Sequence, residues 1–156
     1  MDNEISVHDN VLVSYEVNCE QRSICLHTQF RDRGPPFELT DVVFAGVVAY
    51  QFEHDSTIGT ILFDIEDVAA IDVWRENEAA FRAGRRYGWP GEWADSEESA
   101  KSFFRENTIN GYIVASSCGL TGWILAKCQT RHAYASPREA EQSDPPESPF
   151  SREFES

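Results

Sequence analysis

The chain has 156 residues, of which 27 are Asp or Glu and 13 are Lys or Arg, so its formal net charge is −14 at pH 7. Recognition of nucleic acids depends on basic side chains that neutralise phosphates. This charge therefore argues against a nucleic-acid partner and favours a partner with a basic protein surface. Hydrophobic residues make up 41% of the chain, which is enough for one sizeable core, while the length argues against two independent domains.

The sequence shows no targeting or membrane-spanning segment. Its first residues are acidic and lack the basic start and apolar stretch of a secretory signal, and no run approaches the roughly 18 apolar residues of a membrane span. We therefore expect a cytoplasmic protein without a membrane partner.

The cysteines form no CxxC motif. If Val17 pairs with Ile24 in a hairpin, Cys19 lies opposite Arg22 rather than Cys25, so these two cysteines are out of register for a disulfide. Buried or half-buried free thiols in a reducing compartment are therefore expected, rather than disulfides or zinc ligands, at Cys19, Cys25, Cys118 and Cys128.

Alternating apolar and polar residues predict β-strands in the first half of the chain. A hairpin is expected over residues 11–31, and the consecutive prolines Pro35 and Pro36 interrupt the pattern before the next strand. Three further strands are expected, at residues 37–45, 47–53 and 60–66.

The strands at 47–53 and 60–66 are expected to pair with each other, with Phe52 opposite Phe63. This register leaves Glu53, Asp64 and Glu66 on the reverse face. Because unpaired carboxylates are costly to bury, we expect that face to meet solvent or a basic partner.

The hydrophobic period then changes to three and four residues, which predicts a helix over 68–83 followed by Gly84. A second helix is expected from an N-cap at Asp95 to about residue 107. We therefore expect two helices in the middle of the chain.

Two short strands, at 112–117 and 123–128, are expected to close the domain. The following Ser, Pro and Glu-rich residues have little apolar surface to bury. The sequence thus predicts one α+β domain at 1–132, with an antiparallel sheet of about six or seven strands and two helices packed on one face, and a disordered acidic tail at 133–156.

The acidic sheet face is the first candidate binding site, because clustered carboxylates accelerate association with Lys- or Arg-lined partners. Its alternative is an ordinary solvated face. The loop 55–59 lacks the Asp-x-Asp-x-Asp-Gly pattern of a calcium site, and we expect no metal or cofactor. The carboxylates assigned to partner binding are Glu53, Asp55, Asp64, Glu66 and Asp67.

The loop at 85–93 is the second candidate, since it holds Tyr and Trp residues of the kind that are enriched at binding hot spots. Tyr87 and Trp89 are assigned as apolar anchors for a partner. The alternative is that the tryptophans fold back over the core, and this interpretation is favoured for Trp93.

Catalytic motifs are absent from the sequence. Ser14, Glu16 and His27 fall on one face of the first hairpin, but a triad also needs a strained nucleophile and an oxyanion hole, and no Gly-x-Ser-x-Gly elbow is present. No Gly-rich phosphate loop appears either. We therefore expect a non-catalytic protein.

Several short stretches resemble uncharacterised bacterial domains, and with its small size, acidity and architecture the chain is similar to the small acidic immunity proteins of bacterial polymorphic-toxin systems. The resemblance covers about residues 10–130. It implies a cytoplasmic inhibitor that covers the active cleft of a basic toxin with carboxylates in place of substrate phosphates, and it assigns no individual residue. The stretches are Asp41-Val42-Val43-Phe44, Tyr50-Gln51-Phe52-Glu53, Ile61-Leu62-Phe63-Asp64-Ile65-Glu66 and Arg86-Tyr87-Gly88-Trp89-Pro90.

Two other classes of function remain open. A small-molecule-binding or structural module is expected to show an apolar pocket beneath Trp74, Trp89 and Trp93. A small enzyme of unrecognised type is expected to bring Ser14, Glu16 and His27 together in a cleft.

Overall fold

The computed structural model describes residues 5–134, which form an α+β fold with one antiparallel sheet. The fold class is as predicted, but within the described residues the sheet has eight strands and there are three α-helices. The strands are β1 (Val11–Asn18), β2 (Ser23–Phe30), β3 (Glu38–Ala45), β4 (Ala49–Glu53), β5 (Ile61–Val68), β6 (Asn110–Cys118), β7 (Thr121–Ala126) and β8 (Cys128–Tyr134). The helices are α1 (Ala70–Glu76), α2 (Glu78–Arg85) and α3 (Glu97–Asn107), and a short 3-10 helix, η1 (Glu92–Asp95), precedes α3.

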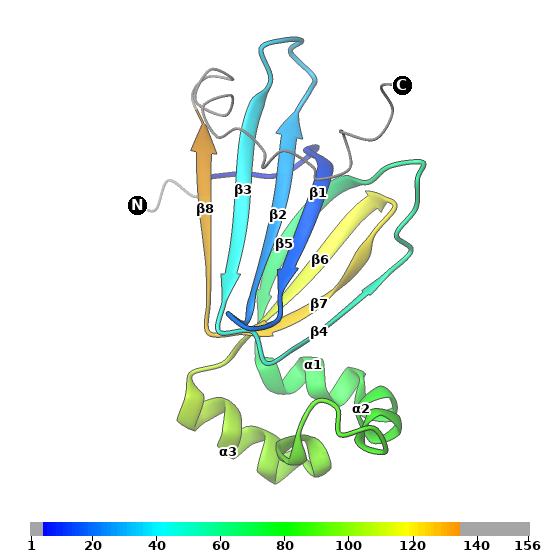
Figure 1. The fold of residues 1–156 in the computed structure, drawn as a ribbon, viewed down its shortest axis with the longest axis vertical. Helices are drawn as coiled ribbons and strands as arrows, with labels where there is room; N and C mark the ends of the chain where they lie inside the picture. Colours follow the sequence, from blue (N-terminus) through cyan, green and yellow to red (C-terminus); the bar gives the residue numbers. More distant parts are fainter. Residues whose placement is uncertain (1–4, 135–156) are drawn as a thin grey trace, which may run out of the picture.

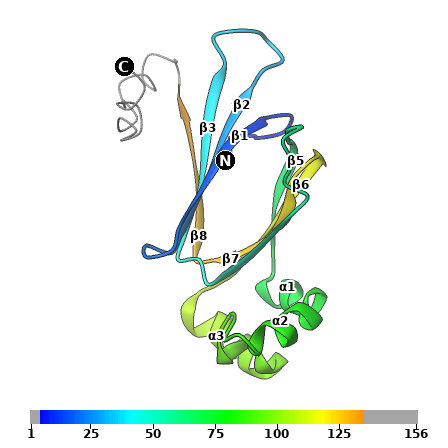
Figure 2. The same ribbon diagram turned by 45° about the vertical axis from the view of Figure 1, so that its right-hand side comes forward.

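The sheet has the strand order β4-β7-β6-β5-β1-β2-β3-β8 and bends sharply in its middle. The register between β1 and β5 contains one residue pair, Val11 and Ile61, so the sheet divides there. We call the two parts the β5 half (β4, β7, β6 and β5) and the β2 half (β1, β2, β3 and β8). Figures 1 and 2 show the two halves converging at the end where β7 continues into β8.

The inner faces of the two halves enclose the main core. Alternate residues of each strand point inward, as the period of two requires, and Phe44 of the β2 half packs edge-on against Tyr112 of the β5 half. Arg131 of β8 also crosses this interior, since its guanidinium donates to the carbonyl oxygens of Ile5 and Ile65. The buried side chains of this core include Ile24, Leu26, Val42, Leu62, Ile65, Val114 and Ile124.

The helices pack against the outer face of the β5 half, at the end shown lowest in Figure 1. The helices pack on this face because strand β7 is apolar on both faces. Ile124 points into the main core, while Trp123 and Leu125 pack against the helices. Phe81 of α2 lies 5.3 Å from Trp123 between ring centroids. The apolar face is therefore covered by the bent sheet itself, and the helices share the opposite face with the acidic side chains.

The predicted pairing of β4 with β5 is wrong. Strand β4 lies at the sheet edge and pairs with β7, with Phe52 opposite Gly122. Strand β5 pairs with β6, so two strands separate β4 from β5. The two-sided apolar strand β7 offers β4 a buried neighbour, whereas a β4–β5 hairpin would leave β7 at an edge.

The faces of β5 also differ from the prediction at two positions. The register with β6 shifts on both sides of Leu62, and such bulges reverse the facing of residues along a strand. Leu62 is consequently buried in the core, and Phe63, expected to point inward, is 51% exposed. Asp64 and Glu66 remain on the outer face, as predicted, opposite Ala115 and Ile113.

The first predicted helix is divided in two by Asn77, whose side chain donates to the carbonyl oxygen of Val73. The cap predicted at Asp95 is also wrong, because Ser96 accepts from the backbone of Ser99 and forms a reciprocal capping box with it. Ser96 is extended, as an N-cap requires, whereas Asp95 is still part of η1. Gly84, expected after the helix end, lies within the last turn of α2.

The last strand was not predicted. Strand β8 pairs with β3 along its whole length and completes the β2 half. It extends to Tyr134, two residues beyond the predicted domain boundary, and the predicted tail from residue 135 onward lies outside the described residues.

Candidate functional site

The outer face of the β5 half is strongly acidic. Its four strands contain no lysine or arginine. Asp64 and Glu66 are exposed on β5, and Glu53 is exposed on the same face of the edge strand β4. Because no cation of the half-sheet itself offsets these charges, the face carries a net negative potential that attracts basic groups.

A groove of about 520 Å³ lies where this face meets α1. Three exposed carboxylates line it, from Glu66 of β5 and from Asp72 and Glu76 of α1. Arg75 is the cation among the described lining residues, and it is already engaged, with Nε 2.5 Å from Glu97 and Nη1 3.4 Å from Asp72. The groove is therefore suited to a further cationic side chain.

The structure brings only some of the predicted acidic residues together. Glu53 is separated from Asp64 and Glu66 by the strands β7 and β6. Asp55 accepts a hydrogen bond of 2.9 Å from the Tyr15 hydroxyl, which raises the pKa of that phenol because the bond favours its neutral form. Asp67 pairs in register with Tyr112 and so belongs to the other face of β5. The charge cluster thus centres on Asp64, Glu66 and α1.

Exposed apolar side chains lie beside this cluster, at the junction of the two halves. Phe63 of β5 contacts His8, with ring centroids 5.2 Å apart in an edge-to-face arrangement. Ile61 pairs with the start of β1, and the preceding loop carries the fully exposed Ile58. An exposed apolar strip next to carboxylates is typical of protein-binding surfaces.

The aromatic residues assigned as partner anchors do not lie with these acids. Trp89 is half-buried and stacks on Phe81, with centroids 5.2 Å apart, so it is largely a core residue. Trp93 stacks on Phe103 at 4.8 Å, as the core interpretation expected. Tyr87 is 83% exposed, but it follows α2, next to Arg86, and does not line the groove.

The pocket expected for a small-molecule module is small. Trp74 is buried, and its indole Nε1 donates to the carbonyl oxygen of Ala94. The cavity that Trp89 lines has a volume of about 160 Å³, below the roughly 300–1,000 Å³ of typical ligand pockets. Packing of the tryptophans against phenylalanine rings fills this region.

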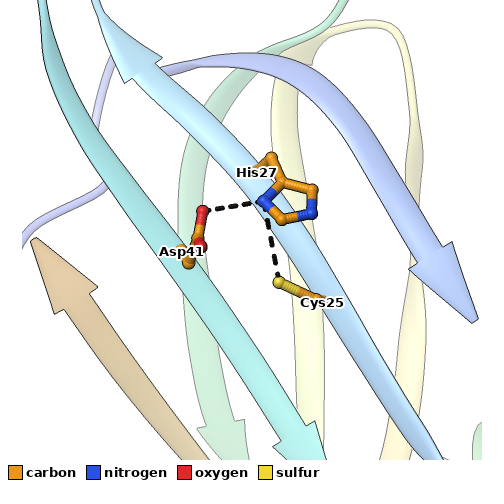
Figure 3. Close-up of side chains that lie close together, drawn as sticks. All are labelled: Cys25, His27 and Asp41. Atoms are coloured by element: carbon orange, nitrogen blue, oxygen red, sulfur yellow. Dashed lines mark hydrogen bonds and ion pairs between the residues drawn. The ribbon is translucent and has the colours of Figure 1, made fainter. Parts of the chain in front are cut away.

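A second polar cluster lies on the outer face of the β2 half. Cys25 and His27 alternate along β2, and Asp41 lies directly opposite His27 on β3. Figure 3 shows the three side chains converging: His27 Nδ1 is 2.8 Å from Asp41 Oδ1 and 3.8 Å from Cys25 Sγ. All three are partly exposed.

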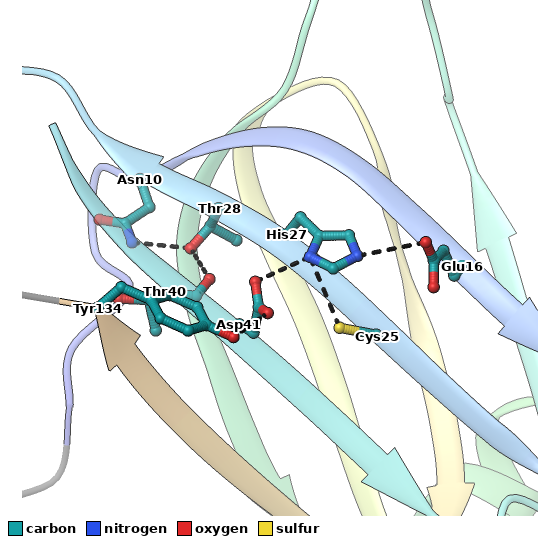
Figure 4. Close-up of polar contacts among 8 residues, drawn as sticks. All are labelled: Asn10, Glu16, Cys25, His27, Thr28, Thr40, Asp41 and Tyr134. Carbon is teal, nitrogen blue, oxygen red and sulfur yellow. Dashed lines mark hydrogen bonds and ion pairs between the residues drawn. The ribbon is translucent and has the colours of Figure 1, made fainter. Parts of the chain in front are cut away.

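Further residues hold this cluster in place (Figure 4). Glu16 of β1 approaches the second ring nitrogen of His27, with Oε1 3.6 Å from Nε2. The Tyr134 hydroxyl donates to Asp41 Oδ2 at 2.8 Å. Burial, together with the charges of Asp41 and Glu16, raises the pKa of the Cys25 thiol to about 11.

The cluster does not have the geometry of a nucleophilic triad. Ser14 lies opposite His27 in the β1–β2 register, as predicted, but the groups placed on the imidazole are Cys25, Asp41 and Glu16. Cys25 and Asp41 share one ring nitrogen, whereas a triad places nucleophile and orienting acid on different nitrogens. A high thiol pKa also disfavours the thiolate that nucleophilic attack needs.

Sequence reasoning missed Asp41 because its place beside His27 depends on the pairing of β2 with β3. The alternation Cys25-x-His27, which puts a thiol and an imidazole on one strand face, was the available signal. The four cysteines are free thiols, and Cys25 is half-buried as predicted, but the expectation of buried or half-buried thiols is wrong for Cys19, Cys118 and Cys128, which are exposed.

Comparisons with protein-family models, curated proteins and solved structures gave no match. Within residues 5–134, no helix has the length and apolar character needed to cross a membrane.

Proposed function

We propose that the chain is a non-catalytic protein-binding domain that recognises a basic partner through the outer face of β5 and the adjoining groove. The observation that carries this proposal is the groove between β5 and α1, where Glu66, Asp72 and Glu76 face one arginine that is already paired. The groove adjoins a half-sheet without lysine or arginine. A partner rich in Lys or Arg fits this charge distribution.

In this proposal, a lysine or arginine of the partner enters the groove and pairs with the carboxylates of Glu66 and Glu76. The exposed Phe63 supplies apolar contact area next to Asp64 on the same strand. Charge then controls the association rate, and apolar burial controls how long the complex persists.

The resemblance to acidic immunity proteins suggests the biological role. We propose that the partner is a basic toxin, that the domain neutralises it by covering its active cleft, and that the complex forms in the cytoplasm. The small cavity beside Trp89 and the missing triad geometry weigh against the small-molecule and enzyme alternatives.

Capture followed by a salt titration tests the proposal. The full chain is immobilised, a bound protein from its own host is identified, and the association rate of the purified partner is measured from low to high ionic strength. We expect a basic partner whose association slows steeply as salt screens the charges. An acidic partner, or an association rate independent of salt, contradicts the proposal.

A matched pair of variants separates this surface from the general acidity of the chain. The site variant is Asp64→Asn/Glu66→Gln/Glu76→Gln, and the control, Glu20→Gln/Glu38→Gln/Glu106→Gln, changes the net charge equally at exposed positions elsewhere. At low salt we expect association to slow about tenfold or more in the site variant, and much less in the control. Equal slowing in both variants assigns the effect to net charge alone and overturns the site.

A further inference from the structure

We propose that Cys25, His27 and Asp41 form a zinc site on the outer face of the β2 half. This site goes beyond the proposed partner surface, because it lies on the other half of the sheet. The ligand atoms are Cys25 Sγ, His27 Nδ1 and Asp41 Oδ1, which all lie within 4.8 Å of one another (Figure 3).

Cys25 Sγ and Asp41 Oδ1 both contact the same ring nitrogen, His27 Nδ1. His27 Nδ1 carries either a proton or a lone pair, so it donates to Asp41 or accepts from Cys25, but not both. Both partners nevertheless point at this nitrogen, at 2.8 and 3.8 Å. A cation placed between the three atoms accepts a lone pair from each, which a single proton cannot do.

The spacing requires only small movements to hold zinc. For tetrahedral bonds of about 2.0–2.3 Å to N, O and S, the nitrogen lies about 3.4 Å from the oxygen and about 3.6 Å from the sulfur. The Nδ1–Oδ1 distance of 2.8 Å must therefore lengthen, and the Nδ1–Sγ distance of 3.8 Å must shorten slightly. Small side-chain rotations of these partly exposed groups on the paired strands β2 and β3 achieve both changes.

Glu16 and Tyr134 contact His27 and Asp41 in the way that neighbouring residues usually support metal ligands. A ligating imidazole usually directs its second nitrogen at a carboxylate, and a ligating carboxylate is itself hydrogen-bonded. Glu16 lies 3.6 Å from His27 Nε2, and the Tyr134 hydroxyl holds Asp41 Oδ2 (Figure 4). These contacts leave Nδ1 and Oδ1 facing the common position.

The ligand set favours zinc over harder cations. Thiolate and imidazole are preferred by zinc, while calcium and magnesium prefer oxygen ligands alone. The two carboxylates nearby, of Asp41 and Glu16, further favour a divalent cation. His27 is 33% exposed and Asp41 19% exposed in their side chains, so an ion enters directly from solvent and water completes the fourth position.

Cobalt(II) titration of the reduced, chelator-treated full chain tests the site. Cobalt takes up zinc geometry and gives a sulfur-to-metal charge-transfer absorption only when a thiolate is bound. We expect this band to saturate at one cobalt per chain and to disappear when zinc is added. No charge-transfer band at saturating cobalt overturns the proposal.

Two serine variants locate the thiolate. Cys25→Ser should abolish the band, while Cys128→Ser, which changes an exposed thiol on the same half of the sheet, should retain it. A band that survives Cys25→Ser overturns the assignment. Glu16→Gln should keep the stoichiometry but weaken binding about 10- to 100-fold, because it removes the carboxylate behind the imidazole.

A measurement on the unaltered chain keeps the test valid if a variant fails to fold. Ring nitrogen NMR signals of the histidines are followed during zinc addition. We expect Nδ1 of His27 to shift, with His8 and His54 unchanged because they lie outside the cluster. Uniform small shifts of these histidines indicate weak surface binding and overturn the site.

Discussion

Trp89 lies so close over Gly84 that a Cβ atom added to the glycine would fall 2.2 Å from Cε3 of the indole ring. The same ring stacks on Phe81. Gly84 lies in the last turn of α2 and does not have a positive φ, so its backbone conformation does not require glycine. The contact with Trp89 explains why a glycine occupies this position. It also ties the loop after α2 to the helical core, so Trp89 is fixed by packing rather than presented to a partner.

Gly84→Ala should therefore destabilise the domain, although alanine normally favours a helix by up to about 1 kcal/mol over glycine. The new methyl group must displace the indole, and overpacking of this kind costs about 1–3 kcal/mol. Chemical denaturation followed by tryptophan fluorescence measures the change.

The companion variant Trp89→Ala removes the obstructing ring. In that background Gly84→Ala should be neutral or stabilising, because only the helix propensity remains. Equal destabilisation in both backgrounds would show that the Gly84–Trp89 contact is not the cause.

A buried hydrogen-bond chain supports the β2 half. Thr28, which is 1% exposed, accepts from Asn10 Nδ2 at 2.9 Å and donates to the Thr40 carbonyl oxygen at 2.7 Å (Figure 4). Thr28→Val preserves the shape but leaves the buried Asn10 amide without this acceptor and removes the hydroxyl contact to the Thr40 carbonyl.

We expect Thr28→Val to lower the free energy of unfolding by about 1–3 kcal/mol, the usual cost of unsatisfied buried polar groups. Thr130→Val on the exposed face of β8 is the control, since its hydroxyl lies 3.3 Å from Nε2 of the exposed His132, and it should change stability by less than about 0.5 kcal/mol. A midpoint shift in urea compares the two, and equal shifts would refute the role of the chain.

Local sequence patterns predicted the first hairpin with its register, because a short turn fixes which residues face each other. Val17 pairs with Ile24 and Ser14 with His27, as expected. The pairing of β4 was wrong, since β7 lies about seventy residues further along the chain, and no local pattern states which distant strand is the better neighbour.

The candidate sites, like the fold, were predictable where they depend on a local pattern and not where they depend on distant strand or helix contacts. Asp64 and Glu66 were placed on the outer face from alternation alone. The contribution of Asp72 and Glu76 required the position of α1 against β5, and that of Asp41 required the β2–β3 pairing. Each of these depends on tertiary contacts that the sequence period does not encode.

The apolar part of the partner surface can be located by comparing two exposed aromatic residues. Phe63→Ala should increase the dissociation rate of the captured partner severalfold or more, because Phe63 is exposed directly before Asp64 on β5. Tyr87→Ala should have little effect, since Tyr87 follows α2 and is not among the residues that line the groove. Surface plasmon resonance gives both rates, and a larger effect for Tyr87→Ala would move the surface to the 85–93 loop.

The four free thiols should differ in reactivity in the chelator-treated, reduced chain. Burial, Asp41 and Glu16 raise the pKa of Cys25 from its ordinary value of 9.0 to about 11, so its thiolate appears only at more alkaline pH. A pKa that is higher by about 2 lowers the thiolate fraction at pH 8 about a hundredfold. The more basic thiolate is about tenfold more nucleophilic, which offsets part of this loss in the alkylation rate. Alkylation of Cys25 should therefore be about tenfold slower than that of the exposed Cys19, Cys118 and Cys128.

Mass spectrometry after timed iodoacetamide treatment measures the four rates separately. Asp41→Asn removes one of the negative charges that raise the pKa of Cys25, so the thiolate fraction at pH 8 should rise and the alkylation of Cys25 should accelerate relative to the exposed thiols. Glu38→Gln, an exposed change at the far end of β3, should leave the rate unaltered. If Cys25 reacts as fast as the exposed thiols in the unaltered chain, the carboxylates do not act on it as the structure indicates.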